Sequence, residues 1–261
     1  MLKQIPRQIF CLTLIFVLVK ISFAEDPTAL KTLEKSETTK NGVADTSSYL
    51  DSIKQELQKK WSKNRTINFV FHGHSVPAGY FKTPEVRSFQ AYPLLVHQAA
   101  KEIYPFAVVN AINTSIGGEQ SESGAARFQR DVLTHQPDVI FIDYALNDRS
   151  IGLERAKKAW ESMIKKAIEQ KIKIILLTPT PDWSANILDE NASLSKHASQ
   201  IRELAAKYNV GLVDSYAAFQ EKVKSGENVR DYLSQINHPN EKGHKIVTEL
   251  IMQFLKNNNS K

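Results

Sequence analysis

The chain has 261 residues, of which 42% are hydrophobic and 24% charged, and its formal net charge is +6. This length and composition suit one large hydrophobic core, which excludes a disordered chain and favours a single α/β domain. Because the positive charge is mild and no basic run carries interleaved aromatic residues, we expect no nucleic-acid partner.

Residues 1–24 have the pattern of a secretory signal peptide. Lys3 and Arg7 precede an apolar run from Ile9 to Val19, and Ser22-Phe23-Ala24 places small residues before a cleavage site. The run is about half the length that a membrane-spanning helix needs, which favours a cleaved signal over an anchor. We therefore expect a periplasmic or secreted protein that has no membrane contact after cleavage.

Cleavage after Ala24 would leave a mildly charged chain without cysteine. The signal contains three basic residues and no acidic one, so its removal lowers the net charge from +6 to +3. The only cysteine, Cys11, lies within the signal, so the mature chain has no disulfide and no thiol chemistry. Residues 25–45 are polar and lack aromatic residues, which predicts a flexible linker before a folded domain at 46–261.

Helical and strand patterns alternate along this domain. Apolar residues at helical spacing predict helices over 46–63, 92–103, 121–135, 153–167, 194–208 and 246–254. Continuous apolar runs predict buried strands at 67–71, 106–112, 138–144, 173–178 and 210–213. Such strands alternating with amphipathic helices predict a parallel sheet that is covered by helices on both faces.

The strand at 67–71 leads into a candidate nucleophile. It runs into Gly73-His74-Ser75, so Ser75 stands at the carboxyl end of a buried strand, where open α/β sheets bind their ligands. A plain turn would also explain glycine, serine and the following Pro77 and Gly79. A serine hydroxyl needs a base to become a nucleophile, and His238 near the far end of the chain is a candidate for that base.

Two further loops follow predicted strands, Gly117-Gly118 and Asn147-Asp148. Glycine lets a backbone N–H approach a substrate closely, and a neutral asparagine amide donates a hydrogen bond without adding charge. Taken alone, the glycine pair is typical of a turn and Asn147-Asp148 of a helix cap. Their combination with Ser75 and His238 favours acyl transfer by a serine nucleophile.

These four segments together resemble the sequence blocks of the SGNH/GDSL hydrolase family, over roughly residues 66–256. The resemblance implies a flavodoxin-like three-layer α/β/α fold with a five-stranded, mostly parallel sheet. It implies Ser75 as the nucleophile and His238 as the base. It also implies an oxyanion hole made by the N–H groups of Ser75 and Gly118 and by the Asn147 amide. No cofactor and no metal is expected.

Three positions depart from the family pattern. His74 replaces the aspartate of Gly-Asp-Ser, and Ala145 replaces the first glycine of the Gly-x-Asn-Asp block. Gln235 stands three residues before His238, where the family usually has aspartate. A carboxylate there fixes the histidine tautomer and stabilises the imidazolium, whereas Gln235 carries no charge. We therefore expect a Ser-His dyad, or a third member from elsewhere in the chain.

The predicted function is an exported serine esterase that hydrolyses an oxygen ester, such as acetate on a carbohydrate. Its substrate would be a small molecule or a glycan ester, and the protein is expected to be a monomer. The alternatives are a lipid or thioester acylhydrolase with the same machinery, and a catalytically silent glycan-binding member of the fold.

Loops at the same sheet edge supply candidate pocket residues, namely Tyr80, Phe81, Asp182 and Trp183. A metal site would be an alternative use of this edge, with His72 and His74 beside Asp143 or Asp148, but no ligand spacing supports it.

Overall fold

The computed structural model describes residues 42–256, so the predicted signal peptide and residues 25–41 of the predicted linker lie outside the described residues. Its centre is a five-stranded sheet in the order β2-β1-β3-β4-β5, and every neighbouring pair is parallel. This is the order of flavodoxin-like doubly wound sheets, and it confirms the predicted fold class. The strands are β1 Thr66–Gly73, β2 Val108–Asn113, β3 Val139–Asp143, β4 Lys173–Leu177 and β5 Gly211–Val213.

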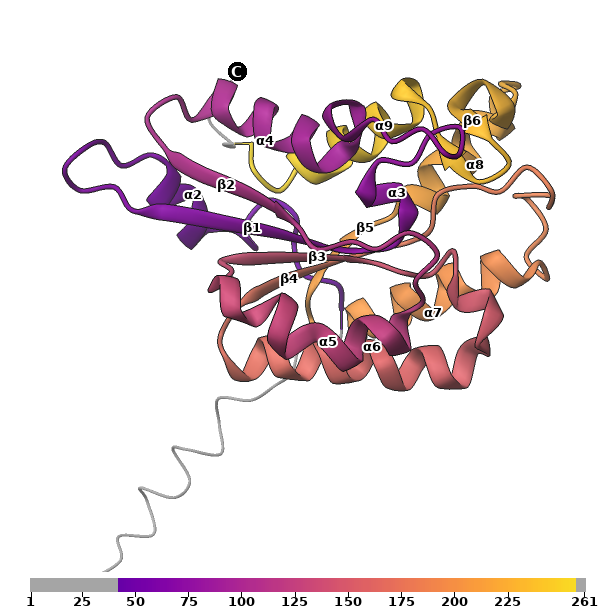
Figure 1. Ribbon diagram of the computed structural model, residues 1–261, viewed down its shortest axis with the longest axis horizontal. Coiled ribbons are helices and arrows are strands. Elements are labelled where there is room, and N and C mark those ends of the chain that lie inside the picture. Colours follow the sequence, from indigo (N-terminus) through magenta and orange to yellow (C-terminus); the bar gives the residue numbers. More distant parts are fainter. Residues whose placement is uncertain (1–41, 257–261) are drawn as a thin grey trace, which may run out of the picture. The chain divides into compact units, whose positions relative to one another are not determined.

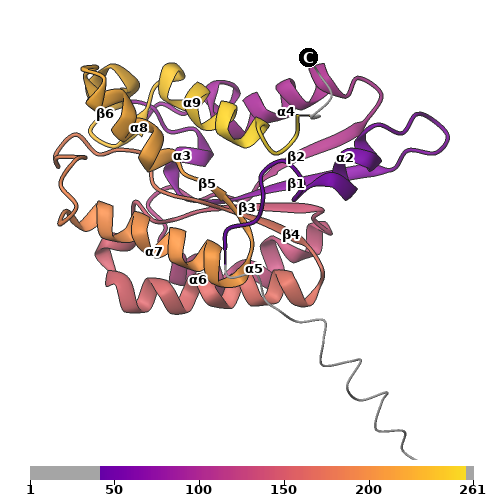
Figure 2. The same ribbon diagram turned by 180° about the vertical axis from the view of Figure 1, so that it is seen from behind.

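Helices cover both faces of this sheet (Figures 1 and 2). One face carries α2 Asp51–Leu57, α4 Tyr92–Ile103, α8 Ser215–Lys224 and α9 Glu241–Met252. The other face carries α5 Ser121–Asp131, α6 Gly152–Glu169 and α7 Ser193–Tyr208. Phe71 of β1 stacks on Phe141 of β3 in the first layer, while Val70 and Ile140 pack into the second. The alternation of side chains along each strand thus produces two cores, one on each side of the sheet.

The helix predicted over 46–63 is shorter in the structure. It spans Asp51–Leu57, and Trp61, which the periodicity placed on its apolar face, is 89% exposed in a turn after it. Leu50, Ile53 and Leu57 already complete the buried face, and the residues around Trp61 are charged or polar. Helical spacing therefore identified the helix but overestimated its length.

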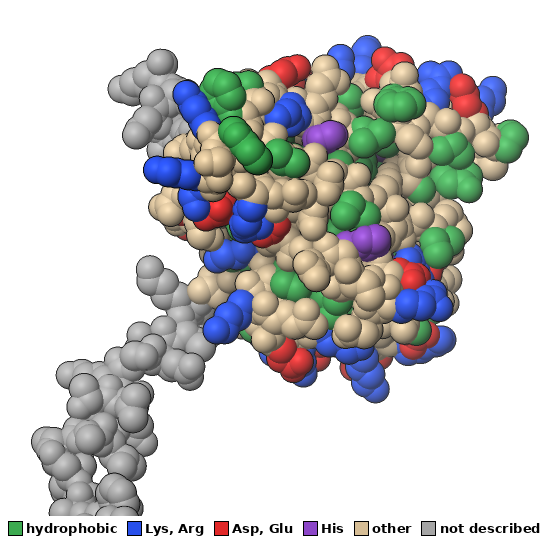
Figure 3. All heavy atoms as spheres, turned by 60° about the vertical axis from the view of Figure 1, so that its left-hand side comes forward, with side chains coloured by type: hydrophobic (Ala, Val, Ile, Leu, Met, Phe, Trp, Pro, Cys, Tyr) green, Lys and Arg blue, Asp and Glu red, His purple; other side chains and the backbone are tan. Residues whose placement is uncertain are grey.

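The strand predicted as buried at 106–112 is the edge of the sheet. β2 has only β1 as a neighbour, and Phe106 and Val108 are 57% and 48% exposed. A run of apolar residues does not distinguish an edge strand from a central one, because the order of strands depends on contacts that are distant in sequence. Figure 3 shows hydrophobic side chains reaching the surface among lysine and arginine side chains.

Several short elements were absent from the sequence prediction. They are α3 Ser75–Ala78, α8 Ser215–Lys224, the antiparallel pair β6 Leu233–Gln235 and β7 His238–Pro239, and the 3₁₀ helices η1 Ser88–Gln90, η3 Asp148–Ser150 and η4 Val229–Tyr232. The helix predicted over 121–135 ends at Asp131 in α5, and the 3₁₀ helix η2 Leu133–His135 follows it. No helix within residues 42–256 combines the length and the apolar character needed to cross a membrane.

Candidate active site

A sharp strand-to-helix turn presents Ser75. β1 ends at Gly73, and Ser75 is already the first residue of α3. A Cβ at Gly73 would lie 2.4 Å from the carbonyl oxygen of Asp143, so only glycine allows this approach of β1 to β3. Helix α3 then ends at Ala78, and its C-cap residue Gly79 has a φ of +94°, which favours glycine.

His74 performs a capping role in this turn. Its Nδ1 accepts a hydrogen bond from the Val76 N–H at 3.2 Å, which requires the proton to be on Nε2. Nε2 lies 3.3 Å from Oδ1 of Asp143, and both side chains are buried. The hydroxyl of Tyr92 donates to the other oxygen of Asp143 at 3.1 Å, and burial raises the pKa of Tyr92 well above its usual value. The buried carboxylate of Asp143, itself held by Tyr92, therefore supports His74, the residue that precedes Ser75.

Ser75 and His238 are in hydrogen-bond contact although 163 positions separate them in the sequence. His238 Nε2 lies 3.0 Å from Ser75 Oγ. The β6–β7 pairing places His238 directly opposite Gln235, which holds the histidine in a fixed register. A pocket of about 420 Å³ opens above this pair, and its lining consists of Ser75, Tyr80, Thr83, Gly117, Gly118, Asn147, Gln235, Asn237 and His238. The four sequence-predicted site residues, Ser75, Gly118, Asn147 and His238, thus share one pocket.

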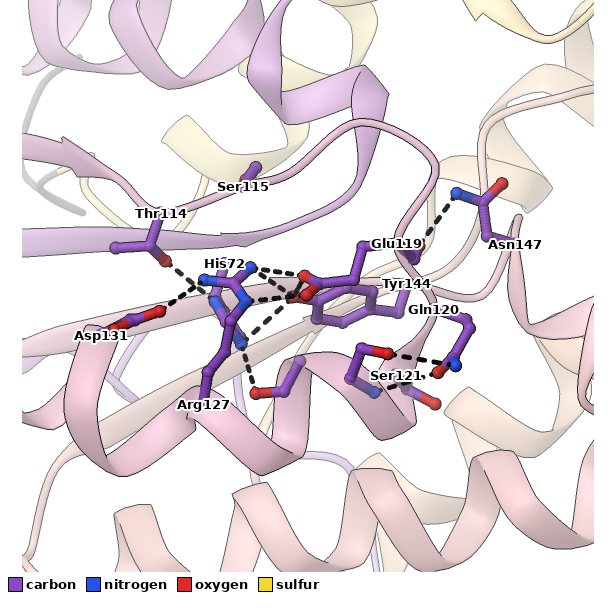
Figure 4. Close-up of polar contacts among 12 residues, drawn as sticks. His72, Thr114, Ser115, Glu119, Gln120, Ser121, Arg127, Asp131, Tyr144 and Asn147 are labelled. Carbon is purple, nitrogen blue, oxygen red and sulfur yellow. Dashed lines mark hydrogen bonds and ion pairs between the residues drawn. The ribbon is translucent and has the colours of Figure 1, made fainter.

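The glycine loop and Asn147 meet at the wall of this pocket. Gly118 has a φ of +78°, a conformation that L residues rarely adopt. A Cβ at Gly117 would lie 2.9 Å from the ring of Tyr80, so a larger residue there would displace that ring. Asn147 donates one amide hydrogen from Nδ2 to the carbonyl oxygen of Glu119 at 2.9 Å (Figure 4). An amide nitrogen carries two hydrogens, so the second is available to a ligand.

Asn147 makes no side-chain capping bond to the 3₁₀ helix η3 that follows it. The neighbouring Asp148 is buried instead, where it accepts from the Ser121 N–H and from Trp160 Nε1, both at 2.7 Å. Burial raises the pKa of Asp148, and these two donors oppose that shift. No hydrogen bond therefore supports the alternative role of the Asn147 side chain as a helix cap.

Two groups contact His238 at Nδ1, and neither is a carboxylate. The carbonyl oxygen of Phe81 lies 2.9 Å away, and Gln235 Nε2 lies 2.8 Å away. Oε1 of Gln235 accepts from the Thr83 N–H at 2.9 Å, which fixes the orientation of the amide. Burial lowers the pKa of His238 below its ordinary value, although the Phe81 carbonyl opposes the shift. At pH 7 the imidazole is therefore neutral, as a general base must be.

The other candidate residues have different places. Tyr80 lines the pocket, whereas Phe81 is buried and contributes its carbonyl oxygen. Asp182 and Trp183 lie outside the lining: Asp182 forms an ion pair with Arg149 at 2.8 Å, and Trp183 packs beneath a guanidinium group. Thr83 and Asn237 also line the pocket but were not predicted from the sequence. Asn237 could have been predicted because it directly precedes His238.

The two histidines considered as metal ligands have protein partners. His72 contacts Thr114 Oγ1 at 2.9 Å and the Gly124 carbonyl oxygen at 3.2 Å, while His74 contacts Val76 and Asp143 as described above. Across residues 42–256, no three histidine, cysteine or carboxylate side chains are grouped so that they would hold a metal ion.

Two curated proteins resemble this chain. An acetylxylan esterase of Geobacillus stearothermophilus is 22% identical over 163 residues, which cover 58% of this chain and 74% of that protein. The uncharacterized lipoprotein YqeF of Bacillus subtilis (strain 168) is 26% identical over 174 residues, covering 54% of this chain and 71% of the relative.

Solved structures share the fold. A two-domain esterase (CEX) active on acetylated mannans, co-crystallised with mannopentaose, has a TM-score of 0.67 and 25% identity, and the match covers 82% of this chain and 56% of that one. The acetylxylan esterase Axe2 of Geobacillus stearothermophilus has a TM-score of 0.62 and 21% identity, with 72% and 94% covered. The matched region is thus about half the length of the two-domain esterase.

A family model gives the assignment. Residues 71–246 match the model of the GDSL-like lipase/acylhydrolase family. This range contains all four sequence segments on which the resemblance was based, from Gly73 to His238. The chain therefore belongs to the GDSL-like lipase/acylhydrolase family, a family of carboxylic ester hydrolases.

Proposed function

We propose that this protein is a serine esterase that hydrolyses an oxygen ester through an acyl-enzyme on Ser75. The observation that carries the proposal is the 3.0 Å contact between Ser75 Oγ and His238 Nε2, in a pocket that Gly118 and Asn147 also line. Nucleophile and base within hydrogen-bond reach are the signature of covalent acyl transfer.

The reaction follows from this geometry. Ser75 Oγ attacks the ester carbonyl carbon while His238 Nε2 takes the hydroxyl proton. The carbonyl oxygen becomes an oxyanion, to which the N–H groups of Ser75 and Gly118 and the Asn147 amide donate. His238 then returns the proton to the leaving alcohol as the C–O bond breaks. Water, deprotonated by His238, finally attacks the acyl-enzyme and releases the acid and free Ser75.

The Phe81 carbonyl oxygen occupies the position at His238 Nδ1 where a triad carboxylate would accept a hydrogen bond. For Nε2 to accept a proton, Nδ1 must carry its own, and the Phe81 oxygen 2.9 Å away accepts that N–H. This interaction selects the reactive tautomer and orients the ring. It supplies a dipole in place of a full charge, so the imidazolium formed during attack is less stabilised than beside a carboxylate.

The proposed substrate is a small acyl group, such as acetate, on a carbohydrate. The acetylxylan esterase and the esterase active on acetylated mannans support this choice.

Esters of different acyl length test the proposal. We expect hydrolysis of p-nitrophenyl acetate, slower hydrolysis of the butyrate and none of the palmitate, together with acetate release from acetylated xylo- or manno-oligosaccharides. A preference for palmitate would establish the lipid-hydrolase alternative. Glycan binding without any hydrolysis would establish the silent alternative, for which Gln235 in place of a carboxylate is the supporting feature.

The nucleophile has a direct test. A fluorophosphonate probe should form an adduct on Ser75, as mass spectrometry of the peptides would show, and Ser75→Ala should abolish both labelling and turnover. Labelling of another serine, or full turnover in the variant, would refute the assignment.

We further propose that the protein is exported as a monomer after cleavage of residues 1–24. The charged start, the apolar run and Ser22-Phe23-Ala24 support cleavage. Sequencing of the exported protein should begin at Glu25, and light scattering should give the mass of one chain. A membrane-bound protein that retains residues 1–24 would contradict the cleavage.

A further inference from the structure

Glu119 adjoins two parts of the proposed oxyanion hole, Gly118 and Asn147. It follows Gly118 directly, and its carbonyl oxygen accepts the hydrogen bond from Asn147 Nδ2 at 2.9 Å. Its own N–H donates to the Ile116 carbonyl oxygen at 3.2 Å and closes the turn that contains the glycine pair. Any movement of the Glu119 backbone would therefore displace both the Gly118 N–H and the Asn147 amide.

The Glu119 side chain is fixed by a buried ion pair with Arg127 of α5 (Figure 4). Oε1 accepts from Arg127 Nε at 2.8 Å, and Oε2 accepts from Arg127 Nη2. The two side chains are only 8% and 9% exposed. Tyr144, immediately after β3, donates its hydroxyl to Oε2 at 2.7 Å. The carboxylate thus connects the glycine loop to a helix and to the central sheet.

Two uncharged side chains, His72 and Tyr144, lie close to the ion pair of Glu119 and Arg127. His72 lies 3.2 Å from the Tyr144 hydroxyl, and burial together with the nearby Arg127 charge lowers the pKa of His72 to about 4. Burial and the bond to Glu119 raise the pKa of Tyr144. Both groups are neutral at pH 7. Tyr144 hydrogen-bonds to the ion pair and His72 contacts Tyr144, so neither adds a charge that competes with the pair.

Stability alone is a weak explanation for a buried ion pair. Desolvation of two charges offsets most of their attraction, and apolar replacements are often at least as stable. What this pair supplies is geometry, because a bidentate guanidinium and carboxylate fix direction as well as distance. Oxyanion donors need such preorganisation, since they act only when aimed at the developing charge.

We propose that Glu119 is a positioning residue for the oxyanion hole: its ion pair with Arg127 holds loop 115–120 so that the Gly118 N–H and the Asn147 amide point at one substrate oxygen. The inference rests on the proposed esterase function.

The same helix offers a matched control. Glu122 pairs with Arg155 of α6, through Oε1 and Nε at 2.9 Å, but these side chains are 36% and 59% exposed and neither belongs to the pocket lining. Glu122→Gln therefore makes the same chemical change three residues away, without the proposed consequence.

The first measurement is steady-state kinetics on p-nitrophenyl acetate. Glu119→Gln should lower kcat roughly 10- to 100-fold, the loss expected when catalytic groups shift by a fraction of an ångström to about 1 Å. KM should change less than about threefold, because the donors act mainly on the transition state. Glu122→Gln should retain kcat. A Glu119→Gln enzyme with full kcat would overturn the inference.

A double-mutant cycle separates positioning from general damage. If Glu119 acts through the oxyanion donors, then Glu119→Gln should cost less in the Asn147→Ala background, where only the Gly118 N–H is left to be displaced, than in wild type, since coupled residues are not additive. Losses that multiply would overturn the inference. Arg127→Lys, which keeps the charge but not the bidentate geometry, should also lower kcat at constant KM and serves if Glu119→Gln does not fold.

Hydrogen–deuterium exchange decides the inference independently of catalysis. The backbone amides of residues 116–120 should exchange faster in Glu119→Gln or Arg127→Lys than in wild type and in Glu122→Gln. Inactivity of the wild type on every ester would refute the proposed function, while the exchange result would still support or overturn the role of Glu119. Unchanged exchange in both variants would overturn it.

Discussion

His238 has two partners at Nδ1, and they favour opposite tautomers. The Phe81 carbonyl oxygen accepts a proton from Nδ1, which leaves Nε2 free to accept the Ser75 proton. The Gln235 amide nitrogen can only donate to Nδ1, which would place the ring proton on Nε2, facing Ser75. Gln235 therefore competes with the tautomer that the proposed mechanism requires.

Gln235→Glu removes this competition with little change in shape. A glutamate oxygen would still accept the Thr83 N–H, and the other would accept from His238 Nδ1. The negative charge favours the imidazolium, so the pKa of His238 should rise by about 1 unit or more. Because the base must be deprotonated, the acid limb of the kcat/KM profile should move to higher pH, with kcat equal or higher on the plateau.

The pH–rate profiles of wild type, Gln235→Glu and Gln235→Ala provide the measurement. The alanine variant loses the amide without gaining charge, so its acid limb should stay near that of wild type. An acid limb that is unmoved in Gln235→Glu would show that position 235 is not coupled to the base.

Asn147→Ala tests the side-chain donor of the oxyanion hole. Removal of one preorganised donor should lower kcat by roughly 10²–10³, with little change in KM. Asn110→Ala, on the edge strand and outside the pocket lining, is the control. Steady-state kinetics with circular dichroism would decide, and a loss of less than about threefold would exclude a catalytic donor at this position.

At the scale of elements, the long periodic segments were predictable and the short ones were not. Tyr92–Ile103 has the predicted bounds, because Pro105 follows a complete apolar face. Helix α3, by contrast, has four residues, and its geometry depends on Gly73 meeting β3. Such turns are determined by contacts between strands that are far apart in the sequence, so local periodicity does not reveal them.

The candidate site divides in the same way. Ser75, Gly118, Asn147 and His238, which share one pocket, could be proposed from the sequence because the chemistry expected of each needs a particular side chain, or the absence of one. The Phe81 carbonyl was not identifiable, since every residue has a carbonyl group and only the fold brings this one to His238. The role of Glu119 likewise depends on Arg127, which the packing of α5 against the sheet places beside it.

The cap of α9 is an element-scale prediction. Oδ1 of Asn240 accepts from the N–H groups of Lys242 and Gly243 at 2.9 and 3.2 Å, and this cap follows His238 by two residues. Asn240→Ala should lower the free energy of unfolding by about 1 kcal/mol, the usual value of a lost N-cap. Urea denaturation would measure it, and Asn240→Asp, which retains the acceptor, should lose much less. Equal losses in both variants would contradict the capping role.

At the scale of the whole molecule, three buried histidines make folding sensitive to acid. Burial lowers the pKa of His72 and His197 to about 4 and that of His244 to about 3, and nearby arginines or His238 add to the effect. In the unfolded chain each titrates near pH 6.5. Between about pH 6.5 and 4 the unfolded chain therefore binds more protons than the folded one, so stability falls as the pH falls.

The fall of stability with falling pH predicts a specific profile of the free energy of unfolding against pH. Each such histidine lowers the free energy of unfolding by up to about 1.4 kcal/mol per pH unit within the window, and the loss ends near its folded pKa. Carboxylates with lowered pKa, such as Asp131 at about 2 beside Arg130, lose their contribution only below about pH 4, so the two effects occupy different ranges. Urea midpoints should therefore decline steadily from pH 6.5 to 4.5.

His244 offers the sharpest test of this cause. Its Nδ1 accepts the Tyr92 N–H at 3.2 Å, while its ring stacks on Phe81 with centroids 5.3 Å apart. His244→Asn can keep an acceptor for Tyr92 but cannot be protonated, so it should be less stable at pH 7 yet lose less stability between pH 6.5 and 4.5. Urea denaturation across this range would measure both slopes. Parallel profiles for variant and wild type would show that the acid sensitivity arises from other groups.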